Sequence, residues 1–293
     1  MKKIIKSIYT KLPLKKQAYS LLKKIWIPPE PIYKHLHFTG AFEVLIDRDH
    51  RFKMKHYGSE FRIENEIFWT GLKNAWEKES FNLWIELCKN SDTIFDIGAN
   101  TGVFSLIAKA TNPAAKVYAF EPVERVYNKL CENIELNSYD IEASKNAISN
   151  FTGEAVIYDR DVEHTTSVTV NERRRETETI ETQISTITLD DFIQQNRIKK
   201  IDLIKIDVET HEPQVLEGFQ HFLLKFTPTI LVEILDDSIG RKVERCVKNL
   251  DYLYFNIDEN GGIRQTDKIV KSDFYNYLLC NTEVAKNLGL DTD

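Results

Sequence analysis

The chain has 293 residues, a length that suits one large α/β domain with an accessory segment. Its contents of 42% hydrophobic and 29% charged residues are typical of a globular protein. The net charge of −6 is unevenly spread, because eight lysines and no acid precede Glu30, which leaves about −14 for the rest of the chain. A surface that binds phosphates is basic, so this acidic body argues against a nucleic-acid partner.

The spacing of the cysteines and the length of the apolar runs indicate the cellular compartment in which the protein is found. The four cysteines lie far apart without a C-x-x-C pair, which favours single thiols in a reducing compartment over a disulfide framework or a zinc site. No apolar run reaches about 18 residues, and the N-terminus lacks the apolar core and cleavage site of a secretory signal. We therefore expect a cytoplasmic protein.

Residues 1–26 form a basic amphipathic pattern, which Pro13 divides into two short helices. Two interpretations stay open. The segment contacts an anionic membrane peripherally, at its inner face, or it packs against the body or against a second copy of the chain in a homo-oligomer. The proline-rich residues 27–31 make a stiff connector, so we end this N-terminal segment at residue 30.

Residues 31–90 are expected to form a small cap. Two apolar runs, at 42–46 and 52–54, flank a turn-rich tetrapeptide and predict an antiparallel hairpin. A helix is expected over residues 76–90. For Trp69 and Trp76 near its start, plain packing is favoured over a place in a pocket wall.

Residues 93–106 predict a buried strand, a glycine loop and a helix. Gly98 and Gly102 are four positions apart and no Gly-Lys-Ser/Thr follows, so neither the dinucleotide fingerprint nor a phosphate-binding P-loop is present. Asp96, at the end of the strand, suits a cationic or hydroxylated ligand. A second strand at 116–120 leads into Glu121, whose carboxylate is placed to bind both hydroxyls of a ribose.

Strands and helices continue to alternate along the rest of the chain. Helices are expected over residues 123–137, from 189 onward and over 213–218, and strands at 141–144, 154–158, 184–189, 201–207, 229–235, 252–257 and 275–280. The last two strands are expected to be joined through residues 259–262. Residues 159–182 are charged and rich in threonine, either an acceptor-side loop or a solvated insertion, with His164, Thr166 and Ser167 as its candidate contacts.

Three motifs occur in order: Phe-Asp-Ile-Gly-Ala-Asn-Thr-Gly at 95–102, Ala-Phe-Glu-Pro at 119–122 and Ile-Lys-Ile-Asp-Val-Glu at 204–209. Together they resemble the FkbM family of class I methyltransferases, which depend on S-adenosylmethionine (SAM), over residues 77–233. The resemblance implies a Rossmann-like α/β domain over residues 91–293. Its mostly parallel seven-stranded sheet has the order 3-2-1-4-5-7-6, with helices on both faces. The cofactor contacts that it implies are Asp96, Gly98, Asn100, Thr101, Gly102, Glu121, Pro122, Asn146, Ala147 and Asp207, with Asn146 and Ala147 at the adenine ring.

Methylation of a hydroxyl requires a base within about 3 Å of the acceptor oxygen. Asp207, Glu209 and His211 follow the strand closely enough to converge, and a histidine titrates near neutral pH. They are the catalytic candidates, together with Lys205, which is expected to pair with Asp207 or Glu233. A purely structural His211 is the alternative, because the family more usually carries small residues at positions 210–211. A divalent metal at these acids is disfavoured.

The acid-rich rim and the resemblance favour a sugar or glycan hydroxyl as the acceptor. Two alternatives stay open: a methyltransferase for a non-sugar natural product or an amine, and a non-catalytic scaffold of the same fold at a membrane. An NAD(P)-dependent dehydrogenase is disfavoured by the glycine spacing.

Overall fold

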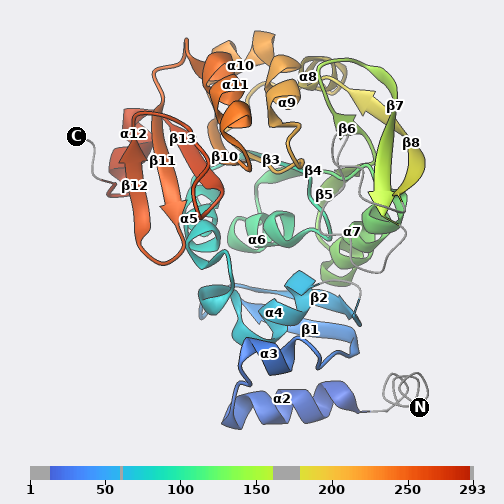
Figure 1. Cartoon of the computed structure of the whole chain (residues 1–293). Coiled ribbons are helices and arrows are strands. Elements are labelled where there is room, and N and C mark those ends of the chain that lie inside the picture. The colour runs from blue at the N-terminus through green and yellow to red at the C-terminus, as the bar shows by residue number, and fades with distance from the viewer. Residues whose placement is uncertain (1–13, 60–61, 161–178, 291–293) are drawn as a thin grey trace.

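A computed structural model describes residues 14–59, 62–160 and 179–290. Its centre is an eight-stranded sheet with the order β12-β11-β13-β10-β9-β3-β4-β5 (Figure 1). The strands are β12 (Gly262–Thr266), β11 (Leu253–Asp258), β13 (Asn276–Cys280), β10 (Thr229–Glu233), β9 (Leu203–Ile206), β3 (Thr93–Ile97), β4 (Lys116–Phe120) and β5 (Ile141–Ser144). Neighbours from β5 to β10 are parallel, and β13 is antiparallel to both β10 and β11.

Without β12, this is the order 3-2-1-4-5-7-6, so the predicted topology is confirmed. The expectation of a direct turn from β11 to β13 is wrong, because β12 forms a hairpin with β11 at the sheet edge. Asp258 Oδ1 accepts hydrogen bonds from the amides of Asn260 and Gly261, and Gly262 has φ +86°, so the chain reverses tightly there. The strand was missed because Ile263 is its only strongly apolar residue.

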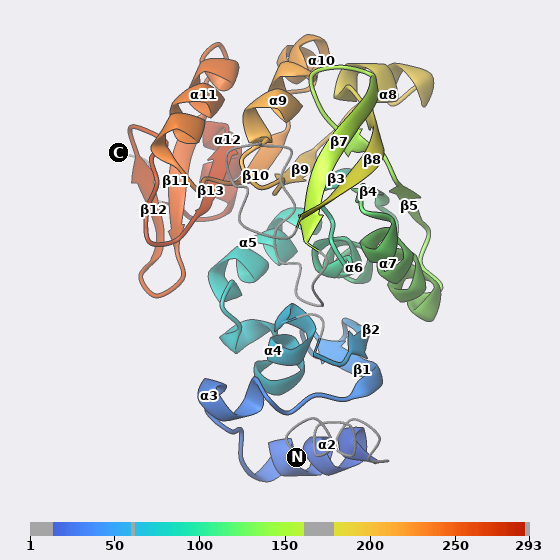
Figure 2. The ribbon, with the colours of Figure 1, turned by 45° about the vertical axis from the view of Figure 1, so that its right-hand side comes forward.

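Helices cover both faces of the sheet, as predicted (Figures 1 and 2). One face packs against α5 (Lys78–Cys88), α6 (Val103–Thr111) and α7 (Glu124–Asn137), and the other against α8 (Leu189–Gln195), α9 (Glu212–Glu217), α10 (Gln220–Phe226) and α11 (Asp237–Val247). Successive side chains of β3 alternate between the two cores, with Ile94 in the first and Phe95 in the second. Asp96 and Lys205 are therefore neighbours on the face that α5 and α6 cover, since they are paired in register. A short helix, α12 (Thr282–Asn287), follows β13.

The predicted hairpin is confirmed as β1 (Thr39–Leu45) and β2 (Arg51–Tyr57). Two asparagines of α7 accept hydrogen bonds from backbone amides of β2 that do not pair with β1. Asn137 Oδ1 accepts from the Lys53 amide at 2.6 Å, and Asn133 Oδ1 accepts from the Lys55 amide at 2.9 Å. The remaining elements of this region are α2 (Lys15–Ile25), α3 (Glu30–Tyr33), α4 (Arg62–Thr70) and the 3₁₀ turn η1 (Leu72–Asn74). The hairpin and α4 share one hydrophobic core with α5 and α6, so this layer supports the helices beneath the sheet.

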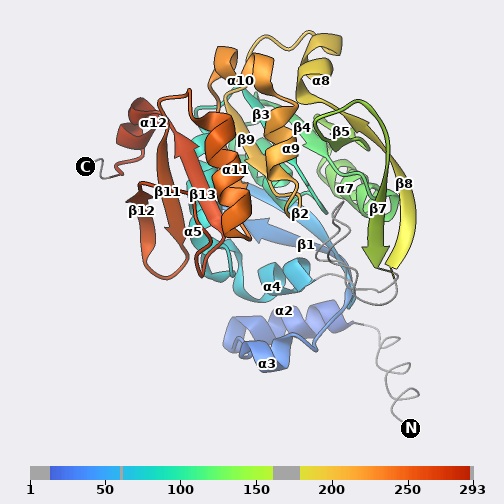
Figure 3. The same cartoon turned by 45° about the horizontal axis from the view of Figure 1, so that its top comes forward.

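A three-stranded sheet lies beside the main one (Figure 3). It consists of β6 (Ala147–Ile148), β8 (Thr179–Ile187) and β7 (Gly153–Arg160), with β7 and β8 antiparallel. The expected strand at 184–189 thus begins earlier, at residue 179, and belongs to this second sheet. The acceptor-contact candidates His164, Thr166 and Ser167 lie outside the described residues. Within the described part of the chain, no helix is long and apolar enough to cross a membrane.

Candidate active site

The glycine loop after β3 packs directly against the segment after β9. Gly98 has φ +82°, and a Cβ atom on it would stand 1.8 Å from the carbonyl oxygen of Asp207. The amide of Asp207 in turn donates to the carbonyl of Ile97 at 3.0 Å. Glycine is required here because two backbones approach each other, in a conformation that other residues rarely adopt.

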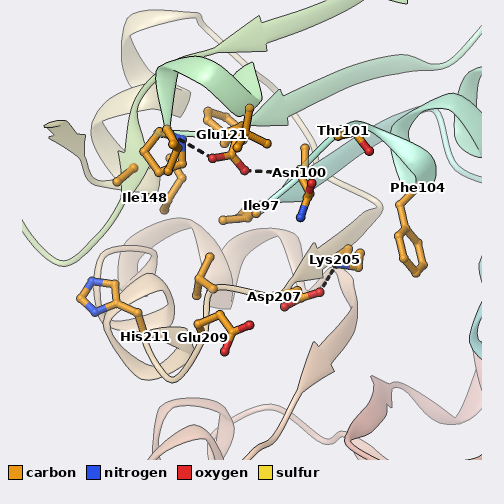
Figure 4. Close-up of a pocket in the computed structure, with 18 of the residues that line it drawn as sticks. Ile97, Asn100, Thr101, Phe104, Glu121, Ile148, Lys205, Asp207, Glu209 and His211 are labelled. Carbon is orange, nitrogen blue, oxygen red and sulfur yellow. Dashed lines mark hydrogen bonds and ion pairs between the residues drawn. The ribbon is translucent and has the colours of Figure 1, made fainter. Parts of the chain in front are cut away.

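Glu121, directly after β4, holds this loop in place. Its Oε2 accepts a hydrogen bond from the Asn100 amide at 3.1 Å, and its Oε1 accepts one from the Val123 amide at 2.9 Å. Asn100 has φ +51°, a strained conformation that the bond from Glu121 helps to maintain. The carboxylate is thereby fixed at the edge of a cavity (Figure 4).

The cavity, of about 260 Å³, lies beyond the carboxyl ends of β3, β4 and β9. One part of its wall is apolar and consists of Phe120, Val123, Val126, Ile148, Ile157 and Ile184. Another part is charged and consists of Arg62, Glu77, Glu121, Lys205, Asp207 and Glu209. In Figure 4, Glu121 and Asn100 lie across the cavity from Asp207 and Glu209. The cavity therefore combines an apolar slot with an acid-rich section.

Lys205 is the buried cation of the charged section. Its Nζ lies 2.8 Å from Asp207 Oδ2 and 4.5 Å from the centre of the Phe104 ring. Burial lowers the pKa of this ammonium, but the carboxylates of Asp207, Asp96 and Glu77 more than offset burial, so the pKa lies above its ordinary value. Lys205 is therefore charged at neutral pH and pairs with Asp207, one of the two partners expected from the sequence.

Asp96 lies behind the cavity wall. Its side chain is fully buried, its Oδ2 accepts from Ser105 Oγ at 2.6 Å, and its Oδ1 has no hydrogen-bond partner among the residues that the structure describes. Burial raises the pKa of this carboxyl, partly offset by Lys205. Asp96 thus acts on the cavity from the second layer, through its charge and its contact with α6.

His211 also lines the cavity, but in a setting that disfavours a general base at neutral pH. Burial lowers its pKa to about 4, and its Nε2 lies 3.0 Å from Ser149 Oγ. The ring is therefore neutral at physiological pH and joins α9 to the segment after β6.

Most of the predicted site residues meet at this cavity. Its lining includes Gly98, Asn100, Thr101, Glu121, Pro122, Asn146, Ala147, Lys205, Asp207, Glu209 and His211, whereas Asp96 and Gly102 lie behind it. Gly102 has φ +97° and faces Leu130 of α7, so it serves the turn into α6. In the described part of the chain, no group of three or more His, Cys, Asp or Glu side chains is arranged to hold a metal ion.

Residues 96–265, more than half of the chain, match the family described as the methyltransferase FkbM domain. The chain belongs to the FkbM methyltransferase family. Membership confirms the enzyme class predicted from the three motifs, a methyltransferase with SAM as its cofactor.

Several known proteins are similar to this FkbM methyltransferase. It is 24% identical over 179 residues to the hexuronic acid methyltransferase AglP of Haloferax volcanii, covering 61% of this chain and 71% of that protein. It is 26% identical over 180 residues to the 31-O-demethyl-FK506 methyltransferase FkbM of Streptomyces tacrolimicus, and the match covers 52% of this chain and 69% of that protein. The solved methyltransferase FkbM of Methylobacillus flagellatus KT matches with 16% identity and a TM-score of 0.39 over 64% of this chain, which spans 43% of that longer protein.

The backbone of this FkbM methyltransferase bends sharply at Glu209 and Thr210. Their φ angles are +54° and +77°, in a region that favours glycine. Glu212 stabilises the bend, since its Oε1 accepts from the amides of Val208 at 3.2 Å and Thr210 at 3.1 Å. The bend directs the Glu209 side chain toward the cavity (Figure 4).

Two residues that were not predicted from the sequence, Glu77 and Arg62, also line the cavity and reach it from the cap. Neither belongs to one of the three motifs, and Glu77 marks the first position of the resemblance, which was the one available signal. Neither Trp69 nor Trp76 lines the cavity. The favoured prediction of plain packing is confirmed for Trp69, which is buried against Tyr19 and Tyr33, whereas Trp76 is 61% exposed.

Proposed function

We propose that this methyltransferase transfers the methyl group of SAM to a hydroxyl of a sugar or glycan. The observation that carries the proposal is the cavity itself, in which an apolar slot adjoins a fixed carboxylate and an acid-rich section. The similarity to AglP, a hexuronic acid methyltransferase, supports a sugar as the acceptor. A non-sugar natural product is the second candidate, supported by the similarity to the 31-O-demethyl-FK506 methyltransferase.

The residues present fit the cofactor. The apolar slot between Phe120 and Ile148 suits an adenine ring, with Asn146 and Ala147 at its edge. Glu121 suits the ribose hydroxyls, because its carboxylate is already oriented by two backbone amides. The acids around Lys205 suit the positive charges of the methionyl end. When bound, SAM supplies a methyl group activated by its sulfonium.

Asp207 and Glu209 then face the place where an acceptor binds. Carboxylates accept hydrogen bonds from sugar hydroxyls and orient them, and Lys205 holds Asp207 in one position at 2.8 Å. Positioning supplies most of the rate in such a reaction, since a neutral hydroxyl gains little from the field of the site.

Calorimetry with SAM tests the cofactor site. Glu121→Ala is expected to lower SAM affinity by at least tenfold, because it removes both the ribose partner and the clamp on the Asn100 amide. Glu124→Ala is the matched control. It removes an equal charge from α7, but its side chain is 71% exposed and is expected to leave the affinity unchanged. Absence of heat with the wild type would favour the scaffold interpretation.

Transfer of labelled methyl from SAM to glycans extracted from a strain lacking the gene tests the acceptor. Label in the glycan fraction, as an ether of a sugar hydroxyl, is the expected result. Label found only in small apolar metabolites would favour the natural-product acceptor.

We further propose that α2 and the connector dock on an anionic membrane surface. α2 packs on the body through Tyr19 and Leu22, and Lys23 Nζ donates to the carbonyl of Phe68. Its other side leaves Leu21 62%, Ile25 86% and Trp26 50% exposed. α2 contains four lysines and no acid, so the apolar stripe is flanked by positive charge that complements anionic lipid.

Sedimentation with phosphatidylglycerol-containing vesicles checks this surface. The double variant Leu21→Glu/Ile25→Glu is expected to lose binding at low salt, because it places charge in the apolar stripe. Leu224→Glu, at a site on α10 that is 56% exposed, is the control and is expected to bind like the wild type. Binding to pure phosphatidylcholine of equal strength, or binding that persists in about 1 M salt, would contradict electrostatic docking.

A further inference from the structure

Glu77 reaches the active site from outside the family-matched residues 96–265. It immediately precedes α5, and its Oε1 accepts a hydrogen bond from Asn276 Nδ2 at 3.0 Å. Asn276 belongs to β13, also outside the matched residues, and the same Nδ2 lies 3.0 Å from Ser80 Oγ. Two segments far apart in the chain therefore hold one carboxylate at the cavity.

Three other acids at or near the cavity, Asp207, Glu121 and Asp96, already make contacts within the protein. Asp207 would have to give up its ion pair with Lys205 on accepting a proton. Both oxygens of Glu121 accept from backbone amides, and Asp96 lies behind the wall. Glu77 Oε2, in contrast, has no hydrogen bond to any residue that the structure describes.

We propose that Glu77 is the general base that takes the proton from the acceptor hydroxyl, with Asn276 as its positioning residue. The inference rests on the proposed function. As the acceptor oxygen bonds to the methyl carbon, the methyl–sulfur bond breaks and its electron pair stays on sulfur. The hydroxyl proton passes to Glu77 Oε2, which later releases it to solvent.

The surroundings of Glu77 suit this role. Burial raises the pKa of its carboxyl to about 7; the Lys205 ammonium opposes the rise, and Asp207 and Glu259 add to it. A base is most effective when its pKa lies near the working pH. His211, with a pKa of about 4, is a weaker base at neutral pH.

Glu77→Gln tests the assignment with the labelled-methyl assay on deletion-strain glycans. The initial rate is expected to fall by about 10²–10⁴-fold, the usual contribution of a general base. The wild-type rate is expected to rise with pH up to about 7, since only the ionised carboxylate accepts a proton, and the variant loses this rise. Glu79→Gln, two residues on and outside the cavity lining, is the control and is expected to keep both the rate and the pH profile.

Two further measurements separate a base from other roles. Asn276→Ala removes a hydrogen bond that favours the ionised form, so it is expected to move the rise to higher pH while preserving the maximum rate. Calorimetry with S-adenosylhomocysteine is expected to give the same affinity for Glu77→Gln as for the wild type.

The outcomes are distinguishable. A tenfold weaker affinity of Glu77→Gln for S-adenosylhomocysteine would assign Glu77 to cofactor binding and overturn the proposal. A rate above one-tenth of the wild type, with the pH rise retained, would also overturn it and leave the methyltransferase function intact. A wild type that transfers no label would instead remove the proposed function, and the base with it.

Discussion

Lys205→Met is expected to destabilise the protein by about 3 kcal/mol. This value is the lower end of the range of destabilisation expected when a buried ion pair loses one partner. Lys205 is 4% exposed, and its ammonium is the cation facing the carboxylates of Asp207, Asp96 and Glu77. Methionine preserves most of the packing against Phe104 but leaves these acids uncompensated. We expect a destabilisation at the lower end of this range because the Asp207 side chain is 33% exposed, so water screens part of its charge.

The effect of Lys205→Met has a defined pH dependence. Lys205 itself stays charged between pH 5 and 8 because its pKa is raised, so the change across this range comes from the acids. A carboxyl whose folded pKa is raised destabilises the fold as pH increases through the interval between its unfolded and folded values. For Glu77 in the wild type this interval ends at about 7, and Lys205 holds it there by opposing the rise. Without Lys205 the folded pKa of Glu77 lies higher and its destabilising effect continues to higher pH, so the variant is expected to lose more stability at pH 8 than at pH 5.

Urea unfolding at the two pH values measures this loss. Lys200→Met is the matched control, because Lys200 also pairs with the acid two residues on, Asp202 at 2.5 Å, yet its side chain is 66% exposed. The control is expected to cost less than about 1 kcal/mol. Equal losses in the two variants would contradict the role of Lys205 as the buried counter-ion of the site.

Gly98→Ala is expected to cost about 3 kcal/mol and to reduce SAM affinity by more than tenfold. The new methyl group would stand 1.8 Å from the carbonyl oxygen of Asp207, and backbone cannot yield as a flexible side chain does. The strain of a left-handed alanine adds about 1 kcal/mol. Because the Asp207 segment must move away, the floor of the cavity changes with it.

Gly58→Ala is the control that separates backbone strain from steric clash. Gly58 has φ +79°, nearly that of Gly98, but the nearest atom to an added Cβ is Thr39 Oγ1 at 3.8 Å. Only the strain of about 1 kcal/mol is therefore expected, with unchanged SAM affinity. Thermal unfolding measures the stability of both variants, and calorimetry measures their SAM affinity. Similar losses of stability and affinity in the two variants would show that the close approach of Gly98 to Asp207 is unimportant.

Much of the cavity lining was predictable because it depends on local patterns, whereas the order of the core strands was predicted from the resemblance to the FkbM family. The loop at 98–102, the acid at 121 and the run at 207–211 each follow a buried strand, and parallel strands bring their carboxyl ends to one edge. Glu121 and Asp207 could be assigned to the site from these positions alone. The strand β12 could not, since its period is obscured by polar residues.

Roles within the site depended on contacts that no local pattern contains. His211 was a candidate base from its residue type, whereas burial lowers its pKa to about 4. Asp96 was expected to contact the cofactor, whereas its side chain is fully buried against Ser105 of α6 and does not line the cavity.

Local periodicity and glycine spacing predicted the alternation of strands and helices and the edge of the sheet where the candidate side chains meet, because these properties arise within single strands and their turns. The enzyme family was predicted from the resemblance of the three motifs. The partners of each charge were settled by packing instead. Glu77 meets Asn276 across 199 positions of sequence, and Lys205 is charged because three acids surround it. Burial and long-range proximity set the pKa of a group, and both exist only after the chain has folded.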